Sequence, residues 1–153
     1  MGKKKKYVPI DPEQNLPLID CHCHIPWKPV PKEMTEPYEE QYQHFLQAGG
    51  KYIIISSIDW ESLQWMLKFL PKHPKCKLTA GFSPQTFVFS TDPELSTNFS
   101  KWKDFILENP EKYIGIGEIG LDFHYAKTLD QRNKQIDGFR DILRSTNQVA
   151  WLN

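Results

Sequence analysis

The sequence predicts an α/β fold in which a parallel sheet is flanked by helices. Short runs rich in β-branched residues alternate with helical patterns along the chain, and the segments between them are short. One run, residues 52–58 (YIIISSI), is apolar along nearly its whole length, which is typical of a strand buried on both faces of a parallel sheet. This alternation is the pattern of consecutive β-α units.

Capping and turn signals bound the predicted elements. Gly49 follows the first helix, where glycine suits the left-handed turn that ends many helices. Asp59 is a candidate N-cap for the second helix, which Pro71 ends, and Pro93 lies in the first turn of the third. Gly138 lies inside the fourth helix, where glycine costs stability. We expect strands at residues 16–24, 52–58, 77–82, 113–121 and 149–152, and helices at residues 33–49, 61–70, 92–106 and 129–144.

The composition is that of a single globular domain. Of the 153 residues, 39% are hydrophobic and 25% are charged, and 19 basic residues balance 19 acidic ones. The bulk charge therefore neither indicates nor excludes a polyanionic partner. Residues 3–6 (KKKK) form the one charge block, so we predict a flexible basic tail over residues 1–15 and one domain over residues 16–153. The alternative is that this lysine block is an arm that binds nucleic acid.

Membrane association is not expected, because no apolar stretch approaches the roughly 18–20 residues that cross a bilayer. The three cysteines are an odd number, which argues against a disulfide framework and predicts a cytoplasmic location. A zinc knuckle built on Cys21 and Cys23 is disfavoured. On a strand these thiols face away from the neighbouring histidines, and no second cysteine pair follows at finger spacing.

The first predicted strand ends in D-C-H-C-H, residues 20–24. Alternate side chains of a strand point to the same face, so we expect Asp20, His22 and His24 to lie together. Two imidazoles on one face of a rigid strand can chelate a divalent cation from one direction, and Asp20 could orient or bind the ion. A single histidine is more often structural, but this pattern favours a metal site.

The fourth predicted strand places Glu118 inside an apolar, glycine-rich run, residues 113–122. Burying an unpaired carboxylate is costly, so Glu118 needs a cation or hydrogen-bond donors. The alternative is a structural salt bridge with an arginine or lysine. Period-two alternation places Glu118 and Asp122 on one face, toward the end of the strand where parallel sheets and barrels carry their active sites.

In these two motifs the sequence resembles the TatD family of metal-dependent deoxyribonucleases. The family's opening I-D-x-H-x-H matches residues 19–24, and its G-E-x-G-L-D signature matches residues 117–122. Gln131-Arg132 also resembles the family's Q-R at the start of the following helix. Other amidohydrolase-like and PHP-type enzymes share the first motif, whereas the pair of motifs is specific. The resemblance runs from about residue 16 to the end of the chain.

The resemblance implies a TIM-type (β/α)8 barrel that binds two divalent metal ions (zinc, manganese or magnesium) and hydrolyses phosphodiester bonds in DNA. It makes His22 and His24 ligands of one ion, and Glu118 the catalytic carboxylate that binds or bridges both ions. Asp20 and Asp122 become supporting residues. The imidazoles favour zinc or manganese.

The length of the chain and two departures from the family's sequence pattern qualify this expectation. A complete barrel takes about 250 residues, so we expect residues 16–153 to be its N-terminal half, roughly four and a half β-α units. Further family ligands come from strands five, six and eight, and Leu152 or Asn153 stands where the strand-five histidine belongs. After the third strand the family often has G-x-H-P-H, but here Ser83 and Gln85 occupy the histidine positions. More chain or a partner is expected to cover the exposed strand faces, or else the product is unstable.

Three functions are consistent with these features. The leading hypothesis is a TatD-like metal-dependent nuclease in its complete form. The absent strands and Ser83 also allow a catalytically inactive remnant that acts as a binding or structural module. The third is an amidohydrolase-like enzyme that acts on a small ester or amide.

Overall fold

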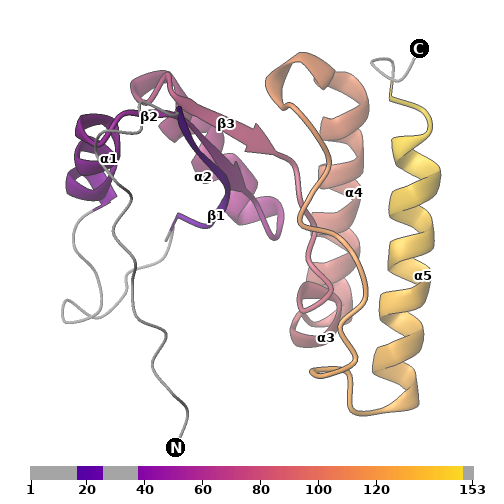
Figure 1. Ribbon diagram of the computed structural model, residues 1–153. Helices are drawn as coiled ribbons and strands as arrows, with labels where there is room; N and C mark the ends of the chain where they lie inside the picture. The colour runs from indigo at the N-terminus through magenta and orange to yellow at the C-terminus, as the bar shows by residue number, and fades with distance from the viewer. Residues whose placement is uncertain (1–16, 26–37, 150–153) are drawn as a thin grey trace, which may run out of the picture.

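Strands and helices alternate from β1 to β3, as the sequence predicts, and the described elements after β3 are helical (Figure 1). The computed structural model describes residues 17–25 and 38–149. The predicted basic tail and nearly all of the predicted fifth strand lie outside these residues. The elements are β1 Leu18–Cys23, α1 Tyr38–Gln47, β2 Gly50–Ser56, α2 Trp60–Phe69, η2 Leu70–Lys72, β3 Cys76–Thr79, α3 Thr86–Phe89, α4 Asp92–Glu108, η3 Pro110–Lys112 and α5 Leu129–Thr146.

The strands form a parallel sheet in the order β1-β2-β3, which confirms the predicted sheet type. In the middle of the sheet, Ile53 of β2 lies beside Asp20 of β1 and Cys76 of β3. The pairing of β1 is irregular between Asp20 and Cys23, just where the histidine motif begins. The carboxyl ends of the three strands meet at one edge of the sheet, which is the edge that carries the site described below.

The prediction of a regular strand at residues 113–121 is wrong. This segment does run beside β3: Ile114 N donates to Leu78 O at 2.8 Å, and Ala80 N donates to Gly115 O at 2.9 Å. Among the described residues, however, it forms a single isolated parallel bridge, between Thr79 and Gly115. Glycines weaken strands because they have no side chain to pack, and this run is rich in them.

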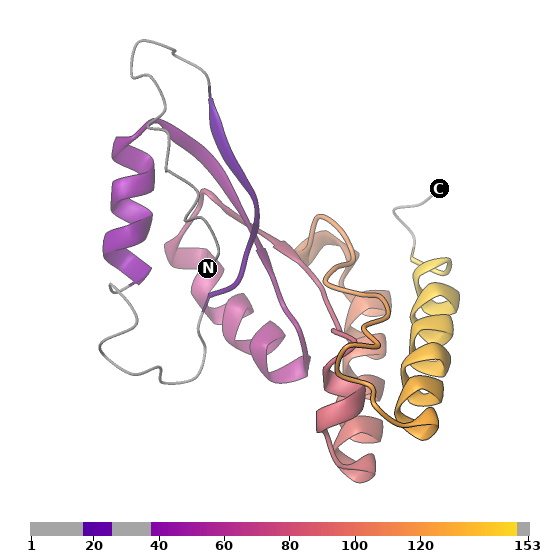
Figure 2. The ribbon, with the colours of Figure 1, turned by 60° about the horizontal axis from the view of Figure 1, so that its bottom comes forward.

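Helix α4 packs against α2 and also against α5. Figures 1 and 2 show α4 and α5 side by side, beyond the end of the three-stranded sheet. The core fills the space between helices and strands with fully buried apolar side chains, each contributing about 1.5–3 kcal/mol. The largest are Trp102, Phe82, Ile25, Ile55, Leu63, Met66, Leu78, Ile106 and Ile142. No helix within residues 17–25 and 38–149 is long and apolar enough to cross a lipid bilayer.

The predicted capping of α2 is confirmed. Asp59 Oδ1 accepts a hydrogen bond from Ser62 N at 2.7 Å, and Ser62 Oγ accepts one from Asp59 N at 3.1 Å. This reciprocal pair satisfies backbone N–H groups at the start of the helix. Because Ser62 Oγ also accepts from Ile58 N at 3.0 Å, the same cap fixes the loop that leaves β2.

The structure explains why glycine stands after the first predicted helix and inside the fourth. Gly49 follows α1 with a φ of +90°, in the left-handed region that ends helices. Gly138 lies inside α5, where a Cβ would overlap the ring of Phe87. Phe87 in turn packs on Phe82, with ring centroids 5.2 Å apart. The absent side chain at Gly138 therefore lets α3 approach α5 closely.

Candidate metal centre

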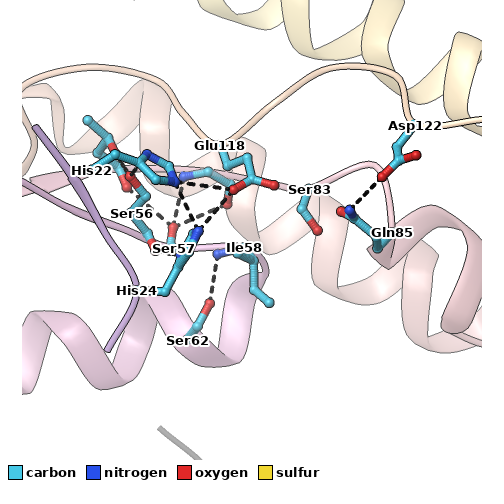
Figure 3. A network of polar contacts seen from close by, with 12 residues as sticks. His22, His24, Ser56, Ser57, Ile58, Ser62, Ser83, Gln85, Glu118 and Asp122 are labelled. Carbon is cyan, nitrogen blue, oxygen red and sulfur yellow. Dashed lines mark hydrogen bonds and ion pairs between the residues drawn. The ribbon is translucent and has the colours of Figure 1, made fainter. Parts of the chain in front are cut away.

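Three side chains converge at the carboxyl ends of the strands: His22 on β1, His24 just after it, and Glu118 (Figure 3). His24 Nε2 lies 3.0 Å from Glu118 Oε2 and 3.0 Å from His22 Nε2. His22 Nε2 lies 3.5 Å from Glu118 Oε2. Within the described ranges this is the one group of three or more histidine, cysteine or acidic side chains whose ligand atoms come together.

The backbone of Glu118 is held against the ends of two other segments. Its N–H donates to Ser57 O at 3.4 Å, and its carbonyl accepts from Phe82 N at 2.9 Å. Gly81 lies at the centre of this crossing. A Cβ there would overlap Ser57 O and Glu118 N, so glycine is what permits the approach. Glu118 thereby reaches the edge of the sheet that the sequence predicts for the site.

The orientation of His24 follows from its backbone partner. Its Nδ1 lies 3.0 Å from the carbonyl oxygen of Ser56. A carbonyl only accepts, so Nδ1 must carry the hydrogen and donate it. In the neutral ring, Nε2 then presents a lone pair to the Glu118 carboxylate, another acceptor, at 3.0 Å. A proton on one of these two atoms or a cation between them is required.

A divalent cation fits this donor set. Two imidazole nitrogens and one carboxylate oxygen lie within 4.8 Å of one another, and zinc and manganese accept such ligands. The side chains are partly open to solvent, with exposed fractions of 54% for His22, 41% for His24 and 31% for Glu118. An ion here would have protein ligands on one side and solvent on the other.

The salt-bridge alternative for Glu118 finds no support in the part of the chain that the structure describes. Its ion-pair partners there are His22 and His24, and neither is a lysine or arginine. Glu118 is also less buried than the apolar run around it suggested, because that run is not a regular strand with neighbours on both sides.

The structure brings neither predicted supporting acid into the group. Asp20 Oδ1 accepts a hydrogen bond from His22 N at 3.1 Å, so it fixes the backbone beside the first histidine. The Asp122 carboxylate accepts from Gln85 Nε2 at 2.9 Å and from His124 N at 3.0 Å. Period-two alternation does not place Asp122 beside Glu118, because residues 113–121 form no regular strand.

The cysteines do not join the group either. Cys21 is exposed, Cys23 is half-buried and Cys76 is buried, and all three are free thiols. Burial raises the pKa of the Cys23 and Cys76 thiols, which disfavours the thiolate that binds zinc. Among the described residues, the ligand group contains His22, His24 and Glu118 and no cysteine.

Sequence reasoning missed the residues that support the histidines. Ser56 Oγ lies 3.2 Å from His22 Nδ1 and 2.7 Å from Thr79 Oγ1. The available signal was two hydroxyls, Ser56 and Ser57, at the end of an otherwise apolar strand. Of the two residues at the family's histidine positions, Ser83 is buried and bonds Thr86, and Gln85 bonds Asp122.

Comparisons with known proteins agree on one family. The family described as TatD related DNase matches residues 19–151. An uncharacterized metal-dependent hydrolase of Buchnera aphidicola subsp. Baizongia pistaciae (strain Bp) is 27% identical over 129 residues, covering 84% of this chain and 45% of that protein.

Two solved structures share the fold. YJJV, a TatD homolog from Escherichia coli K12, superposes with a TM-score of 0.52 at 20% identity, over 78% of this chain and 45% of that one. An uncharacterized amidohydrolase from Saccharomyces cerevisiae superposes with a TM-score of 0.54 at 17% identity, over 71% and 36%. The chain thus spans less than half the length of these relatives. Because the family match covers most of its residues, the chain belongs to the TatD family of metal-dependent hydrolases.

Proposed function

We propose that this chain carries part of the metal site of a TatD-type hydrolase that cleaves phosphodiester bonds in DNA. The observation that carries the proposal is the convergence of His22 Nε2, His24 Nε2 and Glu118 Oε2 at one edge of the sheet. Family membership supports the use of divalent metal. Two ions, zinc or manganese by the nature of the ligands, are the loading that we propose.

Each residue then has a distinct task. His22 and His24 would hold one ion through Nε2, and Glu118 would bind or bridge both ions. Bound metal at such a site activates water and neutralises charge on the phosphoryl group. Asp20, through the backbone of His22, keeps the first ligand in place.

We also propose that residues 16–153 form about the first four and a half units of a (β/α)8 barrel. The parallel sheet and its helices support this, as does the likeness to two longer TatD-like structures. Further ligands would then come from outside the described segments. We propose the cytoplasm as the location, because a reducing compartment keeps the three free thiols reduced.

Hydrolysis assays test the proposed chemistry and separate the three hypotheses. The protein in its complete barrel form is incubated with manganese or zinc and a single-stranded oligonucleotide, a phosphodiester chromogen or a carboxylic ester. We expect metal-dependent cleavage of the first two substrates, and its loss in His22→Ala, because that change removes a ligand. Turnover of the ester alone would favour the amidohydrolase alternative. Metal binding without turnover of any substrate would favour a binding module and contradict the nuclease.

A further inference from the structure

Ser56 contacts both histidines of the candidate metal centre through two different atoms. Its carbonyl oxygen lies 3.0 Å from His24 Nδ1, and its Oγ lies 3.2 Å from His22 Nδ1. Both contacts involve the ring nitrogen that does not face Glu118. They therefore turn the two Nε2 atoms toward the carboxylate (Figure 3). Ser56 is the last residue of β2 and is only 2% exposed, so its position is set by the sheet.

Thr79 fixes the hydroxyl of Ser56. The two residues are partners in the β2–β3 pairing, and Thr79 Oγ1 lies 2.7 Å from Ser56 Oγ. A serine hydroxyl rotates freely unless its hydrogen has a partner. Here the hydroxyl has one partner on the neighbouring strand, Thr79 Oγ1, and one on His22, and either atom of each pair can be the donor. The hydroxyl is thereby tied to two neighbouring strands.

The direction of these hydrogen bonds decides which nitrogen of His22 can bind a metal. If His22 Nδ1 donates to Ser56 Oγ and Ser56 donates to Thr79 Oγ1, then Nε2 is left with a lone pair toward Glu118. In the reverse direction Nε2 carries a hydrogen in the position of the ion. The two histidines differ in this respect, because a carbonyl fixes His24 in one direction.

We propose that Ser56 is a positioning residue that orients His22 and sets its tautomer for metal binding, with Thr79 holding the serine hydroxyl. The inference rests on the proposed metal site. In metal-binding histidines, the group that accepts a hydrogen bond from the second ring nitrogen fixes the orientation of the ring and raises its basicity. A serine present only for packing would influence stability without a specific effect on His22 or on metal affinity.

Calorimetric titration of the full chain with Mn²⁺ tests the proposal, using Ser56→Ala, Thr79→Val and Thr79→Ser. We expect Ser56→Ala to weaken binding about 10–100-fold, the usual loss when such a partner is removed. Thr79→Val removes the hydroxyl at constant shape and should also weaken binding. Thr79→Ser keeps the hydroxyl and should bind as the wild type does. Thermal unfolding of each variant shows that the proteins compared are folded.

Nitrogen-15 NMR of the imidazoles, recorded without metal, gives a second readout. In Ser56→Ala we expect the signals of His22 to change and those of His24 to stay, because the partner of His24 is a backbone carbonyl that the mutation retains. Wild-type Mn²⁺ affinity and unchanged His22 signals in Ser56→Ala would overturn this inference and leave the metal site standing. Failure of the wild type to bind Mn²⁺ would overturn both.

Discussion

Glu118→Gln is expected to abolish divalent-metal binding, with affinity falling by more than about 100-fold. Loss of an outer hydrogen-bond partner already costs about 10–100-fold, and this change removes the only negative charge in the ligand group His22, His24 and Glu118. The amide has nearly the same shape as the carboxylate. The loss is therefore one of charge and ligand strength rather than of fold. Calorimetric titration with Mn²⁺ and Zn²⁺ measures it directly.

Glu108→Gln is the matched control, because it makes the same chemical change at an exposed position on α4. It should bind metal as the wild type does, which rules out a general effect of net charge. Both variants should unfold within a few degrees of the wild type. Metal affinity retained in Glu118→Gln would show that the carboxylate is not a ligand and would remove the basis of the proposed site.

Gly81→Ala is expected to destabilise the protein by about 3 kcal/mol, at the upper end of the usual cost of overpacking. A methyl group there would overlap Ser57 O, Glu118 N and Gly117 C, which are backbone atoms of two other segments and cannot rotate away. At about 2–4 °C per kcal/mol, the melting temperature should fall by roughly 6–12 °C. Because the overlap displaces Glu118, the folded fraction should also bind metal more weakly.

Gly115→Ala provides the comparison for this effect. Its added methyl would meet only Thr79 Cγ2, at 3.6 Å, which is an ordinary contact. A melting temperature near that of the wild type is expected, measured by the same circular dichroism melts. If Gly81→Ala melted like Gly115→Ala and bound metal normally, the close crossing of residues 57, 81 and 118 would not be what holds Glu118 in place.

Much of the fold could be predicted because local signals and tertiary structure agree. The apolar run at residues 52–58 forms the central strand β2, Gly50–Ser56. Asp59 caps α2, and Gly49 follows the end of α1 with positive φ. These features depend on a few neighbouring residues, and the sequence contains that information directly. The histidine pair and Glu118 also stood out in the sequence, because two histidines alternate along a predicted strand and a carboxylate lies within an apolar run.

What the sequence did not reveal depends on contacts between distant segments. Glycine-rich residues 113–121 have the composition of a strand, but after the bridge at Gly115 their backbone leaves regular pairing to cross near Gly81. Alternation along a strand therefore failed for Asp122, which bonds Gln85 instead of joining Glu118. Ser56 is an ordinary strand residue in sequence, and its contact with His22 exists only once β1 and β2 pair.

The central claim, that His22, His24 and Glu118 bind a divalent metal, is tested most directly by X-ray absorption at the zinc edge of the zinc-loaded chain. Cys21 and Cys23 lie beside the same histidines in sequence, and sulfur is readily distinguished from nitrogen or oxygen. We predict a first shell of nitrogen and oxygen at about 2.0–2.2 Å with imidazole outer-shell features. A shell of sulfur at about 2.3 Å would show thiolate ligands and contradict the assignment.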